Sequence, residues 1–178
     1  ILHYLIAQSK KSGMVVKQAE DEISVINMAI GSSFAGVRSM VGTSGGGFAL
    51  MTEAIGLAGQ TETPIVVINS MRGGPSTGLP TKTEQGDLFQ AIGASQGDFP
   101  KVIIAPSTIE DCFYSTIEAF NLADQFQIPV MILSDLFLSE HMESIDDLDF
   151  NSTIERGEIV TSNDSDKLYR RFQYTDTG

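Results

Sequence analysis

The order of apolar and polar positions predicts strands and helices that alternate along the chain. Five short segments, at residues 14–16, 38–41, 64–68, 102–105 and 130–133, carry the side chains typical of strands. The last three are apolar at every position, as are strands covered on both faces. Helical patterns lie near residues 20–35, 47–60, 84–95 and 108–126. This alternation predicts an α/β fold with a parallel β-sheet flanked by helices.

The two ends of the chain differ from this middle part. Residues 1–6 have the pattern of an amphipathic helix, and no Met precedes them, so we expect a piece of a longer protein. From about Ser139 acidic side chains crowd a segment with few apolar positions. We therefore expect one α/β domain at residues 1–138 and, at residues 139–178, an acidic extension or linker toward a following domain.

The helix expected near residues 108–126 has a recognisable start. Ser107 followed by Glu110 is the spacing of a capping box. Cys112 falls inside this helix, and we expect it to be a small buried side chain rather than a reactive thiol.

Composition excludes several classes of function. The chain has 11 Lys and Arg against 23 Asp and Glu, a net charge of −12, which disfavours nucleic acid and anionic membranes as partners. One Cys and two His leave no disulfide or zinc ligand set, so no metal site is expected in this chain. No apolar run approaches the roughly 20 residues of a membrane span. We expect a soluble, cytoplasmic protein.

A glycine-rich turn, Thr43 to Gly47, precedes the second helix. Backbone N–H groups at such a place can bind a phosphate. The turn lacks the Lys of a phosphate-binding loop, and Leu50 stands where a dinucleotide fingerprint has its third Gly. A tight turn that lets segments pack closely explains the glycines equally well.

Two further segments offer polar chemistry. Glu20, Asp21 and Glu22 lie where a strand is expected to end and a helix to begin, which suits either helix-start acids or one carboxylate buried at a ligand site. Arg72 follows the third strand and opens a loop rich in Gly and Pro. Its guanidinium suits a clamp on a substrate carboxylate, or a tie between the loop and nearby acids.

Four segments together resemble a known family. They are Gln18 to Glu22, Thr43 to Phe48, Glu53 to Gly59, and Arg72 to Asp87. They resemble the α subunit of 2-oxoacid:ferredoxin oxidoreductases, and within it the domain that binds the pyrimidine ring of thiamine diphosphate. The resemblance extends over about residues 1–138 and implies the thiamine diphosphate-binding fold.

The resemblance implies roles for individual residues. A Glu in thiamine enzymes hydrogen-bonds the ring nitrogen of the aminopyrimidine and lies nine residues before a helix Gly, which selects Glu22 and Gly31 here. The family's substrate-carboxylate Arg corresponds to Arg72, and its pocket Thr, nine positions later, to Thr81. Ser44 and Gly45 are expected to contact the cofactor.

Two family motifs are absent. A Tyr-Pro-x-Thr-Pro motif, whose Thr contacts substrate, would precede the first helix. The Gly-Asp-Gly motif for diphosphate and magnesium is missing, since Leu follows Gly86-Asp87 and Phe follows Gly97-Asp98. In the family, that motif and a four-iron cluster belong to the β subunit, and one Cys could not hold such a cluster. The resemblance therefore implies a site shared with a β subunit in a hetero-oligomer.

The implied function is coenzyme-A-dependent oxidative decarboxylation of a 2-oxoacid, such as pyruvate or 2-oxoglutarate, with electrons passed to ferredoxin. Two alternatives remain open. One is a non-catalytic assembly domain with a vestigial thiamine site. The other is a nucleotide-binding domain that uses Gly45 to Gly47.

Overall fold

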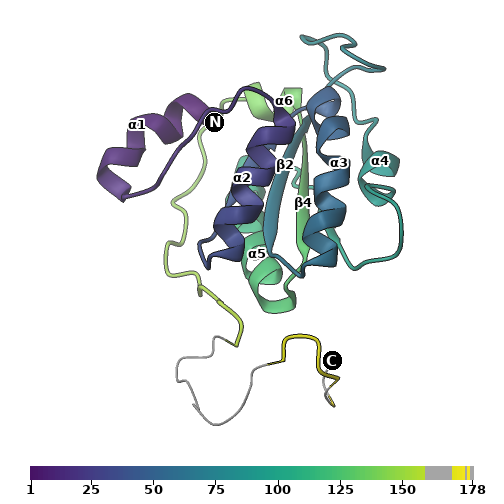
Figure 1. Cartoon of the computed structure of the whole chain (residues 1–178). Coiled ribbons are helices and arrows are strands. Elements are labelled where there is room, and N and C mark those ends of the chain that lie inside the picture. The colour runs from purple at the N-terminus through teal and green to yellow at the C-terminus, as the bar shows by residue number, and fades with distance from the viewer. Residues whose placement is uncertain (159–169, 175, 177–178) are drawn as a thin grey trace.

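Four parallel strands form the central sheet of the computed structural model (Figure 1). The structure describes residues 1–158, 170–174 and 176. The sheet order is β1-β2-β4-β3. The strands are β1 (Met40–Thr43), β2 (Ile65–Met71), β3 (Val102–Ile104) and β4 (Pro129–Asp135). The helices are α1 (Leu2–Ser12), α2 (Glu22–Phe34), α3 (Gly45–Gln60), α4 (Leu88–Ile92), α5 (Ile109–Phe126) and α6 (Leu136–Glu140).

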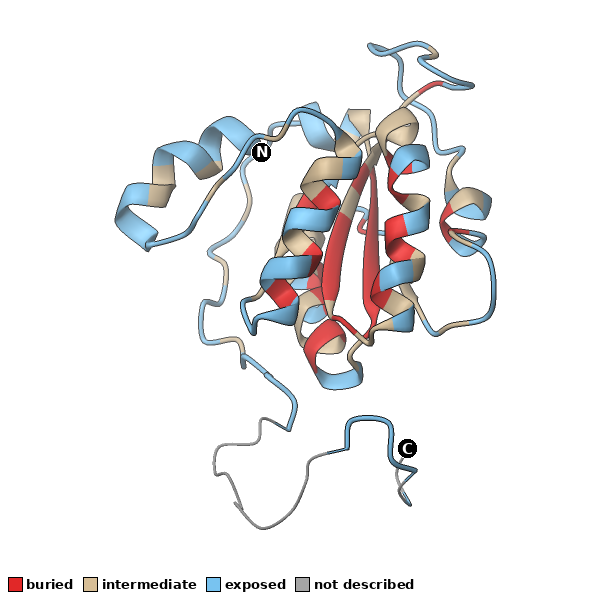
Figure 2. Cartoon of the chain, in the orientation of Figure 1, coloured by how far each residue is buried: buried red, intermediate tan, exposed pale blue. Residues whose placement is uncertain are grey.

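Helices cover both faces of the sheet, so its central strands are buried, as Figure 2 shows. Helices α2 and α3 lie on one face, where Phe48, Met51 and Ile55 of α3 are fully buried. Helix α5 covers the other face through Ala119 and Ala123. The predicted parallel α/β fold is confirmed, and two-sided burial explains the continuous apolar runs of β2 and β4.

One predicted strand and most of one predicted helix are wrong. Residues 14–16 form no strand, and Val15 is 81% exposed. Apolar side chains alone do not make a strand, because a strand needs a neighbour to hydrogen-bond its backbone. The helix expected at residues 84–95 is only Leu88–Ile92. The second strand is displaced by two residues, to Met40–Thr43.

The start of α5 is capped one residue later than predicted. The hydroxyl of Thr108, not Ser107, accepts the bond from the Asp111 N–H at 3.1 Å, and a carboxylate oxygen of Asp111 accepts from the Ser107 N–H at 2.8 Å. Cys112 is half-buried rather than buried. Burial, with a smaller effect of the Asp111 charge, raises the pKa of its thiol. A raised pKa keeps the sulfur protonated at neutral pH, which suits an unreactive cysteine.

The first helix and the chain after α6 lie outside the main body. Helix α1 forms as expected, but none of its residues is buried, and Figure 1 shows it apart from the sheet. Residues 141–158 contain neither helix nor strand. The division into a domain at 1–138 and an extension at 139–178 stays a prediction, and residues 159–169, 175, 177 and 178 are outside the described part.

The described part of the extension is nevertheless attached to the α5 side of the body. The Asp149 N–H donates to the Tyr114 hydroxyl at 3.1 Å. Asp124, which is only 7% exposed, pairs with Arg38 at 2.7 Å and with Arg156 of the extension at 3.0 Å. One buried carboxylate thus joins the body and the extension beside the amino ends of the strands.

Candidate functional site

The glycines that begin α3 lie at the carboxyl end of the sheet, where three distant segments meet. A Cβ on Gly45 would lie 2.9 Å from a carboxylate oxygen of Asp87. A Cβ on Gly46 would lie 3.6 Å from the Ser76 carbonyl oxygen, and one on Gly47 would lie 2.6 Å from Cγ and Oε1 of Glu22. A side chain on Gly45 or Gly47 would force its neighbours to move, whereas one on Gly46 would make an ordinary contact. The glycines therefore serve close packing, one of the two interpretations that the sequence left open.

Glu22 is the first residue of α2, and its position follows from the capping of that helix. Asp21 is the N-cap, and its carboxylate accepts bonds from the Ser24 N–H at 2.7 Å and the Ser24 hydroxyl at 2.5 Å. The Ser24 hydroxyl and then its N–H hold the pKa of Asp21 below its ordinary value. The correction to the sequence analysis is that no strand precedes these acids. The position of these acids is determined by the capping of α2 and by contact with α3.

Replacing Gly47 with alanine is expected to destabilise this chain by about 1–3 kcal/mol, the usual cost of an extra methyl group in a packed position. The added carbon would meet Cγ of Glu22 and the hydroxyl of Thr43, a β-branched residue with little freedom to move. Urea unfolding of the two proteins measures the difference.

Gly31 offers a matched control, because a Cβ there meets nothing within 4 Å. The same substitution inside α2 is expected to stabilise the helix by roughly 0.5–1 kcal/mol. If both alanine variants shift stability in the same direction, the close-packing role of Gly47 is wrong.

A buried amide and a half-buried carboxylate form a pair next to the start of α3. Asn69 of β2 is fully buried, and its Nδ2 donates to Oδ2 of Asp87 at 2.9 Å. The Asn69 Oδ1 and the Ser44 Oγ are buried without any hydrogen-bond partner among the described residues. Buried polar atoms normally have partners, so the Ser44 Oγ at the start of α3 is a candidate to bind a polar group of a bound molecule.

Sequence reasoning missed Asn69 and Asp87 as a pair. It considered Asp87 as the end of a segment that carries the resemblance and as a possible start of a metal motif, but not as a partner of Asn69. The available signal was Asn69 itself, an amide directly after the apolar run Ile65 to Ile68 of a two-sided buried strand.

Residues 72–86, here named the Arg72 loop, connect β2 to α4 at the same end of the sheet (Figure 1). Internal bonds shape the loop: the Gly73 N–H donates to the Lys82 carbonyl at 2.9 Å, and the Leu79 N–H to the Gly73 carbonyl at 2.8 Å. Arg72 is half-buried and Thr81 is exposed. The structure gives no hydrogen bond or ion pair joining either residue to Glu22 within the described part of the chain.

The ion pairs among the described residues leave Arg72 out. They involve Arg38, Arg156, Arg171 and His141. The interpretation that Arg72 ties its loop to nearby acids therefore has no support in the described residues, and the clamp interpretation stays a prediction.

Phosphate binding at the start of α3 conflicts with the charges found there. The carboxylates of Glu22 and Asp87 lie against Gly47 and Gly45. Acidic side chains close to a helix N-terminus repel a phosphate that approaches it. This arrangement disfavours the nucleotide-binding alternative.

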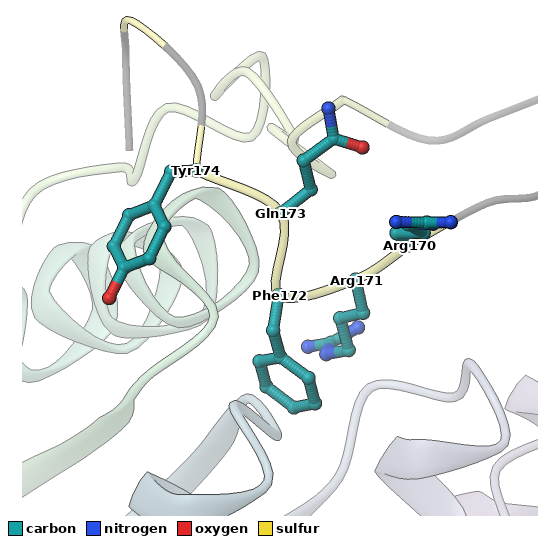
Figure 3. A pocket seen from close by; sticks show the side chains of 5 residues that line it. All are labelled: Arg170, Arg171, Phe172, Gln173 and Tyr174. Atoms are coloured by element: carbon teal, nitrogen blue, oxygen red, sulfur yellow. The ribbon is translucent and has the colours of Figure 1, made fainter.

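A hollow of about 560 Å³ near the C-terminus is not part of this site. Among the described residues it is lined by Arg170 to Tyr174, one continuous stretch (Figure 3). Arg171 pairs with Glu62 at 3.3 Å, shortly before β2 begins, so this stretch lies at the amino end of the sheet. Two searches of the described residues found nothing: no group of three or more His, Cys, Asp or Glu could hold a metal ion, and no helix is long and apolar enough to cross a membrane.

Comparison with known proteins agrees with the resemblance. Residues 1–172 match the family described as "Pyruvate flavodoxin/ferredoxin oxidoreductase, thiamine diP-bdg", in which the abbreviation stands for thiamine diphosphate binding. The chain belongs to this family. The match covers Glu22, Arg72, Thr81 and the glycines of α3, and extends well beyond residue 138.

Curated relatives and a solved structure carry related names. The chain is 44% identical over 177 residues to 2-oxoacid:ferredoxin oxidoreductase 1, subunit alpha, of Sulfurisphaera tokodaii, covering 98% of this chain and 28% of that protein. It is 47% identical over 145 residues to the 2-oxoglutarate synthase subunit KorA of Archaeoglobus fulgidus, covering 82% of this chain and 42% of that one.

The solved structure is the 2-oxoglutarate:ferredoxin oxidoreductase from Magnetococcus marinus with 2-oxoglutarate, coenzyme A and succinyl-CoA bound. It matches with a TM-score of 0.73 and 47% identity, over 75% of this chain and 23% of that one. The chain thus spans less than half the length of each of these relatives.

Proposed function

We propose that this chain is the pyrimidine-binding part of the alpha subunit of a 2-oxoacid:ferredoxin oxidoreductase. The observation that carries the proposal is the position of Glu22, whose carboxylate lies against Gly47 at the carboxyl end of a parallel sheet. Ligands of open α/β sheets bind at that end. The names of relatives 42–47% identical to this chain support the same reaction.

The proposed reaction converts a 2-oxoacid and coenzyme A into an acyl-coenzyme A thioester and carbon dioxide. The bond between the carboxylate and the keto carbon breaks, a carbon–sulfur bond forms, and one proton is released. Two electrons leave the keto carbon and reduce two molecules of ferredoxin. Thiamine diphosphate, when bound, supplies the carbanion chemistry of this reaction.

The residues at the start of α3 suit the aminopyrimidine end of that cofactor. Glu22 would share a proton with the pyrimidine ring nitrogen. Ser44 Oγ is buried without a partner, and Gly45 has no side chain to block its backbone, so both could receive the ring's polar groups. This fit favours a working thiamine site over a vestigial one.

Arg72 and Thr81 would act on the substrate. Arg72 is half-buried and makes no ion pair within the described residues, so its fork of N–H groups remains available for the carboxylate of a 2-oxoacid. Thr81 is on the same loop and would offer a hydroxyl to the pocket.

A β subunit would complete the site with the magnesium and diphosphate contacts and an iron–sulfur cluster. The apolar, glycine-rich side of α3, near residues 44–59, is the expected contact surface. Leu50 of this surface is 51% exposed and would be covered by the partner. A groove of about 310 Å³ between the last turns of α2 and α3 lies at the amino end of the sheet, away from Glu22, and is not part of this expected contact. The assembled hetero-oligomer would work in the cytoplasm with ferredoxin.

The direct test is activity of the purified complex of alpha and β subunits. Ferredoxin reduction should require a 2-oxoacid, coenzyme A and thiamine diphosphate together, and the acyl-coenzyme A product should appear with it. Assays with 2-oxoglutarate and pyruvate compare the substrates. A complex that binds the cofactor without pyrimidine contacts to this chain and consumes no 2-oxoacid would support the vestigial alternative.

The chain alone is expected to fold but to bind thiamine diphosphate too weakly for calorimetry to resolve. It offers contacts for only the pyrimidine end of the cofactor, and a few hydrogen bonds cannot offset the loss of translational and rotational freedom, at least several kcal/mol. The complex with the β subunit should show clear binding in the same calorimeter. Submicromolar binding by the lone chain would contradict a site shared between subunits.

A further inference from the structure

Three of the described helices begin after an aspartate. Of these aspartates, only Asp87 makes no capping bond to its own helix. Asp21 and Asp135 both accept bonds from N–H groups of the helices they begin. Asp87 occupies the same place before α4 but makes no such bond. Its Oδ2 instead accepts from Asn69 Nδ2, across 18 residues of sequence.

The bond between Asn69 and Asp87, here named the clasp, closes the Arg72 loop at its base. Asn69 lies two residues before the end of β2, and Arg72 is the first residue after that strand. Asp87 is the first residue after the loop. The clasp therefore joins the two ends of the loop whose first residue is the proposed substrate clamp.

A second bond holds the same end of the loop over the neighbouring strand. Gln85 Nε2 donates to Oδ2 of Asp135, the last residue of β4, at 2.6 Å. Met71 and Asp135 are register partners in the sheet. The end of the loop is thus attached to two adjacent strands, while its middle reaches the start of α3 through Ser76 and Gly46.

The clasp also has a local cost. Asn69 Oδ1 is buried without a donor, because an ionised carboxylate can accept but not donate. A pair selected for stability alone would satisfy both ends of the amide. An arrangement that leaves a buried oxygen unpaired and a helix uncapped indicates that it is kept for placing the loop.

On the basis of the proposed function, we propose that Asn69 and Asp87 are positioning residues that hold Arg72 at the substrate site. They touch neither substrate nor cofactor in this role. Their bond fixes where β2 ends and the Arg72 loop begins, and it presses the Asp87 carboxylate against Gly45 at the start of α3.

The test uses the complex of the full alpha and β subunits. Asp87→Ala is expected to raise the KM for the 2-oxoacid by about tenfold or more, the factor associated with losing one charge-assisted hydrogen bond, and to change kcat and cofactor affinity much less. Asp87→Asn keeps an acceptor for Asn69 Nδ2 and should remain within about threefold of the unaltered enzyme. Asp98→Ala, at an exposed aspartate after α4, is the matched control and should change nothing.

Two further measurements separate positioning from general damage. The variant carrying both Asn69→Ala and Asp87→Ala should have the KM of Asp87→Ala alone, because both changes break one bond. Amide hydrogen exchange should rise in peptides from residues 73–86 in Asp87→Ala and stay unchanged in Asp98→Ala.

Each result decides between the proposals. Unchanged exchange in Asp87→Ala overturns the clasp, whatever the activity. Raised exchange with an unchanged KM overturns the positioning role, and so does a loss in Asp87→Asn equal to that in Asp87→Ala. If the unaltered complex consumes no 2-oxoacid while exchange responds as expected, the proposed function fails and the clasp remains.

Discussion

Replacing Glu22 with glutamine is expected to lower turnover of the assembled enzyme by roughly 10²–10⁴-fold, the usual effect of removing a group that transfers a proton. Glutamine keeps the size of the side chain and can pack against Gly47 as Glu22 does. It cannot hold a proton that it shares with the pyrimidine ring nitrogen. Stability should therefore change little, and the loss should be in kcat.

Glu20→Gln is the matched control for this prediction. Glu20 is exposed and lies before the Asp21 cap, outside α2. Steady-state kinetics and thermal unfolding of both variants are the measurements. A complex inactivated by Glu20→Gln but active with Glu22→Gln would mean that the wrong glutamate has been assigned.

The layers of the fold were predictable because two-sided burial leaves a strong pattern. Strands β2 and β4 are almost entirely buried, and their sequences are apolar over four or more consecutive positions. The segment at residues 14–16 has the same kind of side chains in a shorter run, yet Met14 is 41% and Val15 81% exposed. Strand formation depends on a neighbouring strand, which three residues of sequence do not reveal.

The contacts of the site were less predictable than its residues. The glycines of α3 indicated either a phosphate or a close approach of backbones. The choice between these two interpretations depends on the contacts of the glycines with Glu22, Ser76 and Asp87. These residues come from three segments spread over more than sixty residues, so the sequence alone did not bring them together. The role of Thr81 came from family resemblance alone, whereas the chemistry of Arg72 already suggested a carboxylate clamp. The described residues supply no ligand contact that tests either role.

The pair formed by Asn69 and Asp87 was partly predictable from the sequence. Asn69 could have been recognised, since an amide beside the apolar positions of a buried strand requires a partner. Its partner could not, because Asp87 occupies an ordinary helix-start position where aspartate usually caps its own helix.

Replacing Arg72 with alanine is expected to raise the 2-oxoacid requirement by about 30-fold to several thousand-fold. Leaving a buried carboxylate without its charged partner costs roughly 2–5 kcal/mol, and each 1.4 kcal/mol is about a factor of ten. Affinity for thiamine diphosphate should change far less. Arg72 lies in the loop after β2, whereas the residues expected to bind the cofactor, Glu22 and Ser44, lie at the starts of α2 and α3.

The variant Arg72→Lys shows whether the shape of the charged group matters. A lysine side chain would keep the charge but not the planar fork that binds both carboxylate oxygens, so Arg72→Lys should recover only part of the loss. The measurement is kcat/KM for a series of 2-oxoacids, with cofactor affinity determined alongside by calorimetry. Arg72 makes no ion pair within the described residues, so its loss should break no internal salt bridge there. Unchanged kinetics across the series would assign Arg72 to the structure of its loop rather than to substrate binding.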